Sequence, residues 1–330
     1  MAEIVLGMAL SHGPMLATTP EQWTLRVSAD RAAKHPFRGR TWSFEELAEH
    51  RRDERFDSQI TLDTRRTRHA ACQQALDGLA ETFAEVKPDV AVIFGNDQME
   101  IFNESLIPAF GVMWGPRIVN AEMTPDHRAK LPAGVAEAVP GHIPPGGATY
   151  EGAPELGCHI IRSLMADSFD VATLKSFPVN ETPHAFGFIY RRVMRDKPVP
   201  SVPLLQNTFF PPNQPSARRC YDFGSAVARA IRAWKNDARV AVFASGGLSH
   251  FVIDEQLDRP FLEALGKRNA AGIIGMREEL LQSGNSEIKN WIALSGAMVS
   301  TDCTFRLVDY VPCYRSEAGT GTANAFACWC

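Results

Sequence analysis

The sequence predicts an α/β fold, with a central, largely parallel or mixed sheet that helices cover on both faces. Two observations support this class. Short apolar runs, typical of strands buried on both faces, recur at residues 4–10, 90–94, 201–205 and 240–245. Longer amphipathic segments, typical of helices, lie between these runs. Strands that alternate with helices favour a sheet with a helical layer on each side.

The N-terminal part of the chain contains a strand, a charged segment and a long helix. The apolar run IVLGMAL at 4–10 is short and lacks a basic leader, which favours a first strand over a signal peptide. Residues 20–68 are dense in charge, and we expect them to form an excursion over the surface or a lid. Residues 64–86 are predicted to form one amphipathic helix. Its apolar face consists of Cys72, Ala75, Leu76, Leu79 and Phe83.

The remaining segments continue the same pattern. Residues 217–237 and 254–284 are helix-like, and the Pro/Gly-rich stretch 139–154 is a long loop of the kind that often forms the wall of a site. The sequence contains no evident repeat, low-complexity tract or linker. We therefore expect residues 1–330 to form a single catalytic domain that carries the charged excursion at about 20–68.

Composition restricts the class of partner. The chain of 330 residues is 45% hydrophobic and 22% charged, as soluble globular proteins are. A net charge of −4 and a pI near 6.2 give no sign of binding to nucleic acid or to an anionic membrane. No apolar run is long enough to span a bilayer. Seven scattered cysteines without a CxxC pair indicate reduced thiols in a cytoplasmic protein.

Side chains that bind metals or move protons follow several of the apolar runs. The stretch GMALSHGPM presents His12, VIFGNDQ presents Gln98, and VFASGGLSHF presents His250 after a tight Gly-Gly turn. In SGNSEIKNWIALSGAM, Glu287 precedes a buried helix, where an acid often has only a capping role. Two neutral nitrogen ligands and one carboxylate suit Fe(II), because they leave open positions for substrate and dioxygen. His12 and Glu287 are candidates for part of that set.

The sequence resembles the type III, LigB-like extradiol ring-cleavage dioxygenases, the group that contains the catalytic β subunit of protocatechuate 4,5-dioxygenase. The resemblance extends over most of the chain, through SHGP, PDVAVIFGND, LIPAFGV, PHAFGFIYRRV, QNTFFPPNQPSARRCYDFG, GGLSHF and SGNSEIKNWI. Within the group, MAEIVLGMALSHGPML and YRSEAGTGTANAFACW are similar to 3-O-methylgallate dioxygenase-like members. The resemblance implies a non-haem Fe(II) enzyme that opens the ring of a catechol- or gallate-type aromatic acid with O2.

The resemblance also implies roles for four residues. His12 and Glu287 occupy positions that bind the metal in the family. His250, in GGLSH, occupies the position of the acid/base near the substrate hydroxyl and the bound oxygen, a task that suits a pKa near neutrality. His184, in PHAFGF, corresponds to a second-sphere residue that faces the substrate.

The chain departs from the family pattern at the second metal histidine. The protocatechuate enzymes have histidine directly after Asn-Asp, and this chain has Gln98. By resemblance this is a metal-ligand position, although an amide oxygen is a weaker donor to Fe(II) than imidazole. Three alternatives stay open: Gln98 binds the metal directly or through water, His50 or His69 fills the vacancy, or the site is degraded and the protein is inactive.

The substrate is less well defined by the sequence. Tyr314, Arg315 and Thr320 are candidates for holding a ring carboxylate or methoxyl, and an arginine pairs with a carboxylate through two parallel hydrogen bonds. A second hypothesis is a ring opener for an aminophenol or hydroxypyridine, and a third is a non-catalytic small-molecule binder that has lost the iron. We expect an aromatic small molecule and O2 as partners, with neither nucleic acid nor membrane, and a homo-oligomer (dimer).

Overall fold

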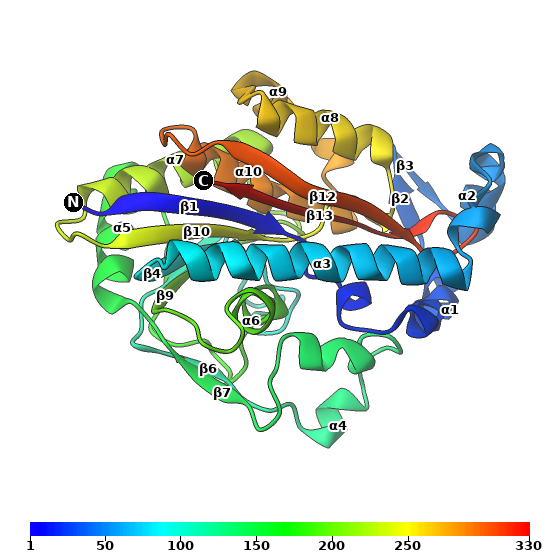
Figure 1. Cartoon of the computed structure of the whole chain (residues 1–330), viewed down its shortest axis with the longest axis horizontal. Helices are drawn as coiled ribbons and strands as arrows, with labels where there is room; N and C mark the ends of the chain where they lie inside the picture. The colour runs from blue at the N-terminus through cyan, green and yellow to red at the C-terminus, as the bar shows by residue number, and fades with distance from the viewer.

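The computed structural model describes all 330 residues, Met1–Cys330, and confirms the α/β class. The strands of the main sheet are β1 (Glu3–Leu10), β4 (Val90–Gly95), β5 (Phe110–Met113), β8 (Ala172–Leu174), β9 (Ser201–Gln206), β10 (Arg239–Ser245), β11 (His250–Val252), β12 (Phe305–Tyr314) and β13 (Thr320–Trp329). Their order is β11-β13-β1-β10-β4-β9-β5-β8, with β12 paired to β13, and they form one mixed sheet of nine strands (Figure 1).

The four strands predicted from the sequence form the parallel centre of this sheet. β1 pairs with β10, β10 with β4, and β4 with β9, all in parallel. In β4, Val90, Val92 and Phe94 point into one hydrophobic core, and Ala91 and Ile93 point into the other. Burial on both faces explains why the run has no polar residue. The carboxyl ends of these strands meet at one edge of the sheet, where α/β proteins usually place their sites.

Helices cover both faces, as predicted. One core contains α5 (Pro154–Ala166), α7 (Ala217–Ala233), α8 (Glu255–Gly266) and α10 (Ile288–Met298). The other contains α3 (Leu62–Val86) and α6 (His184–Phe188), and α3 crosses the front of the sheet in Figure 1. All five residues predicted for the apolar face of α3 are buried. None of the helices combines the length and the apolar character needed to cross a membrane.

The remaining elements are short. They are α4 (Pro125–Arg128), α9 (Ala270–Ile274), the hairpin of β6 (Arg117–Asn120) and β7 (Ala148–Glu151), and short 3-10 or π-helical turns, among them Ala136–Gly141 and Ser283–Glu287. The predicted loop at 139–154 therefore contains the end of one such turn and all of β7.

The charged excursion folds into a 3-10 helix (Pro20–Arg26), α1 (Val27–Ala32), the hairpin of β2 (His35–Phe37) and β3 (Arg40–Trp42), and α2 (Phe44–His50). Figure 1 shows α1, α2, β2 and β3 at the end of the sheet toward which β1 runs. Buried Arg315 donates to both carboxylate oxygens of Asp30, at 2.7 and 2.8 Å, and Arg38 donates to Asp254 at 2.7 and 2.9 Å. These ion pairs hold the excursion against the rest of the molecule.

Helices α7 and α10 cross closely, because glycine lies at the contact on each. A Cβ atom on Gly224 would lie 1.7 Å from the carbonyl oxygen of Ala293, and one on Gly296 would lie 2.1 Å from that of Tyr221. Such distances leave no space for any side chain larger than hydrogen. The crossing fixes the position of α10, and Glu287 directly precedes that helix.

A buried acid holds the segment between β10 and β11. The Asp258 carboxyl accepts hydrogen bonds from the Ser249 N–H at 2.9 Å, the Ser249 hydroxyl at 2.5 Å and the Tyr310 hydroxyl at 2.8 Å. Burial raises the pKa of Asp258 to about 7, and these hydrogen bonds offset only part of the effect. The network therefore anchors the residue directly before His250.

We predict that Gly224→Ala will lower the free energy of unfolding by at least roughly 1–3 kcal/mol, the usual effect of overpacking a core. The matched control is Gly78→Ala in α3, where a Cβ atom has no neighbour within 4 Å. This change should raise the free energy of unfolding by about 0.5–1 kcal/mol, because alanine is the better helix former. Urea titrations of both variants measure the difference. Equal stability of Gly224→Ala and wild type would contradict the close crossing.

We predict that Asp258 makes the protein less stable as the pH rises from about 4 to about 7. The folded-state pKa of about 7 lies above the ordinary value of 3.8, so in this range the folded state holds a proton that the unfolded state has released. The contribution is complete below pH 4 and is lost as the pH approaches 7, at up to about 1.4 kcal/mol per pH unit.

Asp258→Asn tests this prediction, because asparagine stays neutral at every pH. The free energy of unfolding, measured with urea between pH 4.5 and 7.5, should decline less in this variant than in wild type. Asp126→Asn, on the exposed helix α4, is the control and should keep the wild-type slope. An unchanged slope in Asp258→Asn would show that the acid is ionised throughout.

Candidate metal centre

A cavity of about 570 Å³ lies at the carboxyl ends of the parallel strands. Its lining includes the five residues predicted to bind metal or act in catalysis: His12, Gln98, His184, His250 and Glu287. These residues come from separate elements, since they lie after β1, after β4, at the start of α6, at the start of β11 and before α10. The volume is in the range of ordinary small-molecule sites, roughly 300–1,000 Å³.

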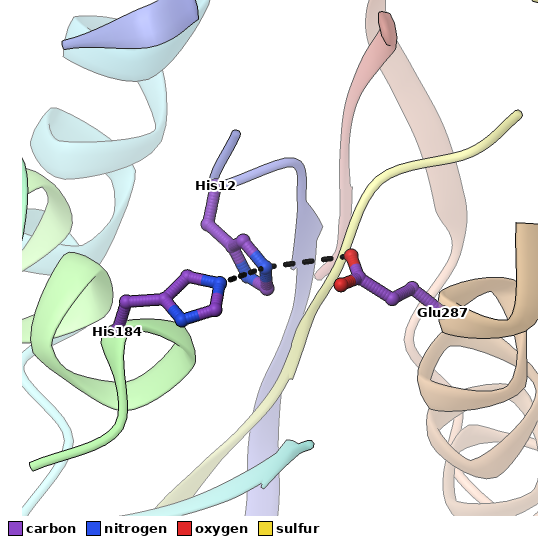
Figure 2. A group of neighbouring side chains, drawn as sticks. All are labelled: His12, His184 and Glu287. Carbon is purple, nitrogen blue, oxygen red and sulfur yellow. Dashed lines mark hydrogen bonds and ion pairs between the residues drawn. The ribbon is translucent and has the colours of Figure 1, made fainter. Parts of the chain in front are cut away.

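Three of these side chains converge most closely. One donor atom from each of His12, His184 and Glu287 lies within 4.8 Å of the other two. The Nε2 atom of His12 is 3.1 Å from Nε2 of His184 and 3.4 Å from Oε2 of Glu287. Figure 2 shows His12 between the other two, with α6 on one side and the start of α10 on the other.

Hydrogen bonds define the tautomer of His12. The Ser245 hydroxyl donates its proton to the carbonyl oxygen of Ala185 at 2.5 Å. It therefore accepts the hydrogen of His12 Nδ1, which lies 2.9 Å away. This leaves a lone pair on His12 Nε2, directed at the group. Burial lowers the pKa of His12, although Glu287 opposes the shift, so the neutral ring is favoured.

His184 is held by a carboxylate. Its Nδ1 atom lies 2.9 Å from Oε2 of Glu100, and its backbone N–H donates to Oε1 at 2.9 Å. Burial opposes a charge on the His184 ring, but Glu100 outweighs it and raises the pKa of His184 to about 9. The same ion pair lowers the pKa of Glu100 to about 2 against the effect of burial. Without a metal, His184 is thus protonated, and its second N–H donates to His12.

A divalent cation fits between His12 and His184, in place of the proton that His184 donates to His12. Two donors at right angles around an ion, each about 2.1 Å from it, are roughly 3.0 Å apart. The separations of 3.1 and 3.4 Å at His12 are close to this value. Histidine ligands usually pass their other N–H to a carboxylate, carbonyl or water, and Glu100 holds His184 in this way. Two histidines and one carboxylate are also a donor set that suits Fe(II).

The Glu287 carboxylate is ionised and held in place. Its Oε2 atom accepts the Gly247 N–H at 2.9 Å, and Oε1 accepts the Asn96 amide at 3.3 Å. Burial opposes the charge, but the surrounding histidines, the protonated His184 among them, outweigh burial, and the pKa of Glu287 lies well below its usual range. The carboxylate does not cap α10, so the ordinary capping role considered for it is wrong.

A chain of buried amides orients Asn96. Asn290 donates to the Asn96 side-chain oxygen at 2.9 Å and to the carbonyl of Ser245 at 2.8 Å. Gln206 in turn donates to the Asn290 oxygen at 2.9 Å. Because the side-chain oxygens of Asn96 and Asn290 each accept from a neighbouring amide, the Asn96 NH2 group has only one orientation, which is toward Glu287.

His250 lies beside this group without being part of it. Its Nδ1–H donates to the carbonyl of Leu248 at 2.7 Å, which leaves the Nε2 lone pair 3.6 Å from Oε2 of Glu287. The His250 backbone N–H donates to Asn285 at 2.9 Å. A Cβ atom on Gly247 would lie 2.9 Å from Nδ1 of His250, so the predicted tight turn needs glycine here. The geometry gives a fixed imidazole with one free nitrogen in the cavity.

Gln98 lines the cavity but makes no hydrogen bond with the three-residue group. The second histidine in that group is His184, whose donor atom lies within 4.8 Å of those of His12 and Glu287. The other two candidates for the vacancy are remote: His50 is exposed and stacks on Trp42 at 4.4 Å, and His69 contacts Gln73 at 3.2 Å. Neither lines the cavity, so the hypothesis that His50 or His69 completes the site is wrong.

The three residues predicted to bind the substrate mainly form hydrogen bonds and ion pairs within the protein. The Tyr314 hydroxyl donates to Glu255 at 3.0 Å and the Thr320 hydroxyl donates to Asp30 at 2.7 Å, and neither residue lines the cavity. Arg315 does line it, but Asp30 holds its Nε and Nη2 atoms. Tyr314 ends β12, Thr320 begins β13, and Arg315 lies in the connection between them. Direct substrate contact by Tyr314 and Thr320 is not supported, because neither residue lines the cavity.

Glu100 was missed from the sequence, although it lies in the same turn as Gln98. Asp97 accepts the N–H groups of Glu100 at 3.0 Å and of Ile101 and Phe102 at 3.1 Å, and so folds this turn. Burial and Glu100 raise the pKa of Asp97 to about 6. The available signal was a second carboxylate three residues after Asp97, at the end of a buried strand.

Comparison with known proteins identifies the family of the chain. Residues 60–326 match the family model of the catalytic LigB subunit of aromatic ring-opening dioxygenases. The chain is also 38% identical over 120 residues to a gallate dioxygenase of Pseudomonas putida, which covers 36% of this chain and 33% of that protein. The match thus spans about a third of the curated relative. Since the family model covers most of the chain, including His184, His250 and Glu287, the chain belongs to the LigB family of aromatic ring-opening dioxygenase subunits.

Proposed function

We propose that the protein is a non-haem Fe(II)-dependent extradiol dioxygenase that opens the ring of a catechol- or gallate-type aromatic acid with O2. The observation that carries this proposal is the convergence of His12, His184 and Glu287 beside His250, inside a cavity of a LigB-family chain. The name of the relative, a gallate dioxygenase, favours the same class of substrate.

We propose His12, Glu287 and His184 as the iron ligands. The ion pair of His184 with Glu100 favours this set, because a metal-bound histidine usually has such a partner. The alternative from the sequence, in which Gln98 binds the metal and His184 faces the substrate, makes a different prediction and is tested below. When bound, Fe(II) supplies a Lewis acid with open positions for the two ring hydroxyls and O2.

His250 moves the proton in this proposal. Its free Nε2 atom faces the cavity, and the bond from Nδ1 to Leu248 keeps the ring in one orientation. It accepts a proton from a ring hydroxyl when the substrate binds and returns a proton later in the reaction. We further propose a single catalytic domain over residues 1–330, since β1 and β13 are neighbours in the sheet. A homodimer and a cytoplasmic location stay predictions from the sequence alone.

We predict that protein loaded with Fe(II) under argon will consume O2 with gallate or protocatechuate and form a yellow ring-opened product. His250→Phe should retain iron but lose turnover by roughly two to four orders of magnitude, because it removes a positioned acid/base. His12→Ala and Glu287→Ala should lose the iron itself. An oxygen electrode and an iron assay measure the two effects.

The rival functions give different outcomes in the same assay. Turnover with aminophenols or hydroxypyridines, but not with catechols, would show that the protein is a ring-opening enzyme for one of those substrate classes. Protein that binds an aromatic acid but no iron would be a non-catalytic binder. Iron shown to be bound, without O2 uptake on any of these rings, would refute the enzymatic proposal.

We predict that iron affinity depends on His184 and Glu100 more than on Gln98. His184→Ala should remove most of the iron, and Glu100→Gln should weaken binding roughly 10–100-fold, the usual effect of losing the partner of a histidine ligand. Gln98→Ala should change the affinity little, and His50→Ala on the surface is the control. Titration with Fe(II) under argon gives the affinities. If Gln98→Ala strips the iron while His184→Ala retains it, the sequence-based assignment is the correct one.

A further inference from the structure

Arg26 places an unpaired cation in the wall of the cavity. It is the last residue of the 3-10 helix in the charged excursion, outside the part of the chain that matches the family model. Its guanidinium makes no hydrogen bond or ion pair with the protein, whereas its neighbours Arg31 and Arg38 pair with Glu317 and Asp254. Arg26 and Arg315 are the two arginines of the cavity lining, which contains no lysine.

The acids around the cavity do not neutralise Arg26. Asp30 is engaged by Arg315 through both of its oxygens. The three carboxylates of the lining each lie beside a histidine: Glu100 by His184 at 2.9 Å, Glu181 by His127 at 3.3 Å and Glu287 by His12 at 3.4 Å. Two guanidinium groups and one aspartate leave one positive charge in excess at this end of the cavity.

The stem of Arg26 is held in place. A Cβ atom on Gly134 would lie 2.8 Å from Cγ of Arg26 and 2.9 Å from its Cδ, so the stem packs directly on this glycine. Burial and the nearby Arg315 lower the pKa of Arg26, although a guanidinium stays charged. Leu131, Pro132 and Val135, which are close to Gly134 in the sequence, also line the cavity. Their apolar side chains suit the face of an aromatic ring.

We propose that Arg26 binds the carboxylate of the aromatic substrate and so selects ring acids over neutral catechols. A planar guanidinium offers two parallel N–H groups to a carboxylate, a geometry that Arg315 already shows with Asp30. The inference deepens the proposed function and rests on it for the ring chemistry. It assigns to Arg26 the carboxylate-binding role that the sequence suggested for Arg315, because Asp30 occupies the Nε and Nη2 groups of Arg315 and the guanidinium of Arg26 has no partner.

Direct binding tests the inference without turnover. Protein loaded with Fe(II) under argon is titrated calorimetrically with 3,4-dihydroxybenzoate and, separately, with catechol. Arg26→Gln should weaken binding of the acid roughly 10–100-fold, the effect of losing hydrogen bonds to a charged group, and should change catechol binding less than about twofold. Arg26→Lys should recover part of the affinity for the acid.

The control is Arg31→Gln, an arginine of the same excursion that does not line the cavity. It should bind both ligands as wild type does, and urea midpoints check that all the variants fold. Equal effects of Arg26→Gln on both ligands, or none on the acid, would overturn the inference. Binding of the acid through Arg26 without any O2 uptake on admission of air would instead overturn the proposed function and leave the role of Arg26 intact.

Discussion

The buried carboxylate of Glu287 is the group on which the rest of the site depends. An ionised acid in a protein interior is unfavourable unless hydrogen bonds and opposite charges surround it. Here the Gly247 N–H, the Asn96 amide and the adjacent histidines provide both. Each of these partners imposes a condition of its own on the fold. The connection after β10 has to turn at Gly247, the Asn96 amide has to point at the carboxylate, and α10 has to begin directly after Glu287.

The charges of the site balance best when both histidines are neutral. Glu100 and Glu287 bring two negative charges into a buried space, and His12 and His184 then offer two lone pairs. A divalent cation matches this arrangement in charge and in number of donors. The protonated His184 of the metal-free protein compensates for only one of the two acids. This difference gives a reason for the second carboxylate, Glu100, which lies behind His184.

Much of the fold could be predicted from the sequence, because strands buried on both faces leave continuous apolar runs. The parallel centre and α3 follow from such local patterns. β12 and β13 were not predicted: β12 is half-exposed along most of its length, and β13 is rich in small residues, as in TGTANAFA. The antiparallel pairing of β13 with β1 joins the two ends of the sequence and is a long-range property that a local pattern does not reveal.

Residues of the site could be predicted from the sequence where they stand in a recognisable motif. Residues whose role depends on a partner far along the chain could not. His12, His250 and Glu287 stand in such motifs, and all three line the cavity. Glu100 gains its significance from His184, 84 positions along the chain. Arg26 lies in a segment where most charges are solvated, so its sequence context resembles that of an ordinary surface residue. Tyr314 and Thr320, predicted to bind the substrate, engage protein side chains and do not line the cavity.

The strand β13 (Thr320–Trp329) lies between β1 and β11, so residues near the two ends of the sequence build one part of the sheet. The hydrogen bond from the Ala325 N–H to the Ser11 hydroxyl joins residues 314 positions apart, and the pair of Arg315 and Asp30 spans 285 positions. Contacts of such high sequence separation form late, because closing a long loop costs entropy before the contact stabilises it. During synthesis on the ribosome, His12 therefore emerges long before the strand that completes its surroundings, and a nascent chain cannot assemble the full donor set until Glu287 has followed.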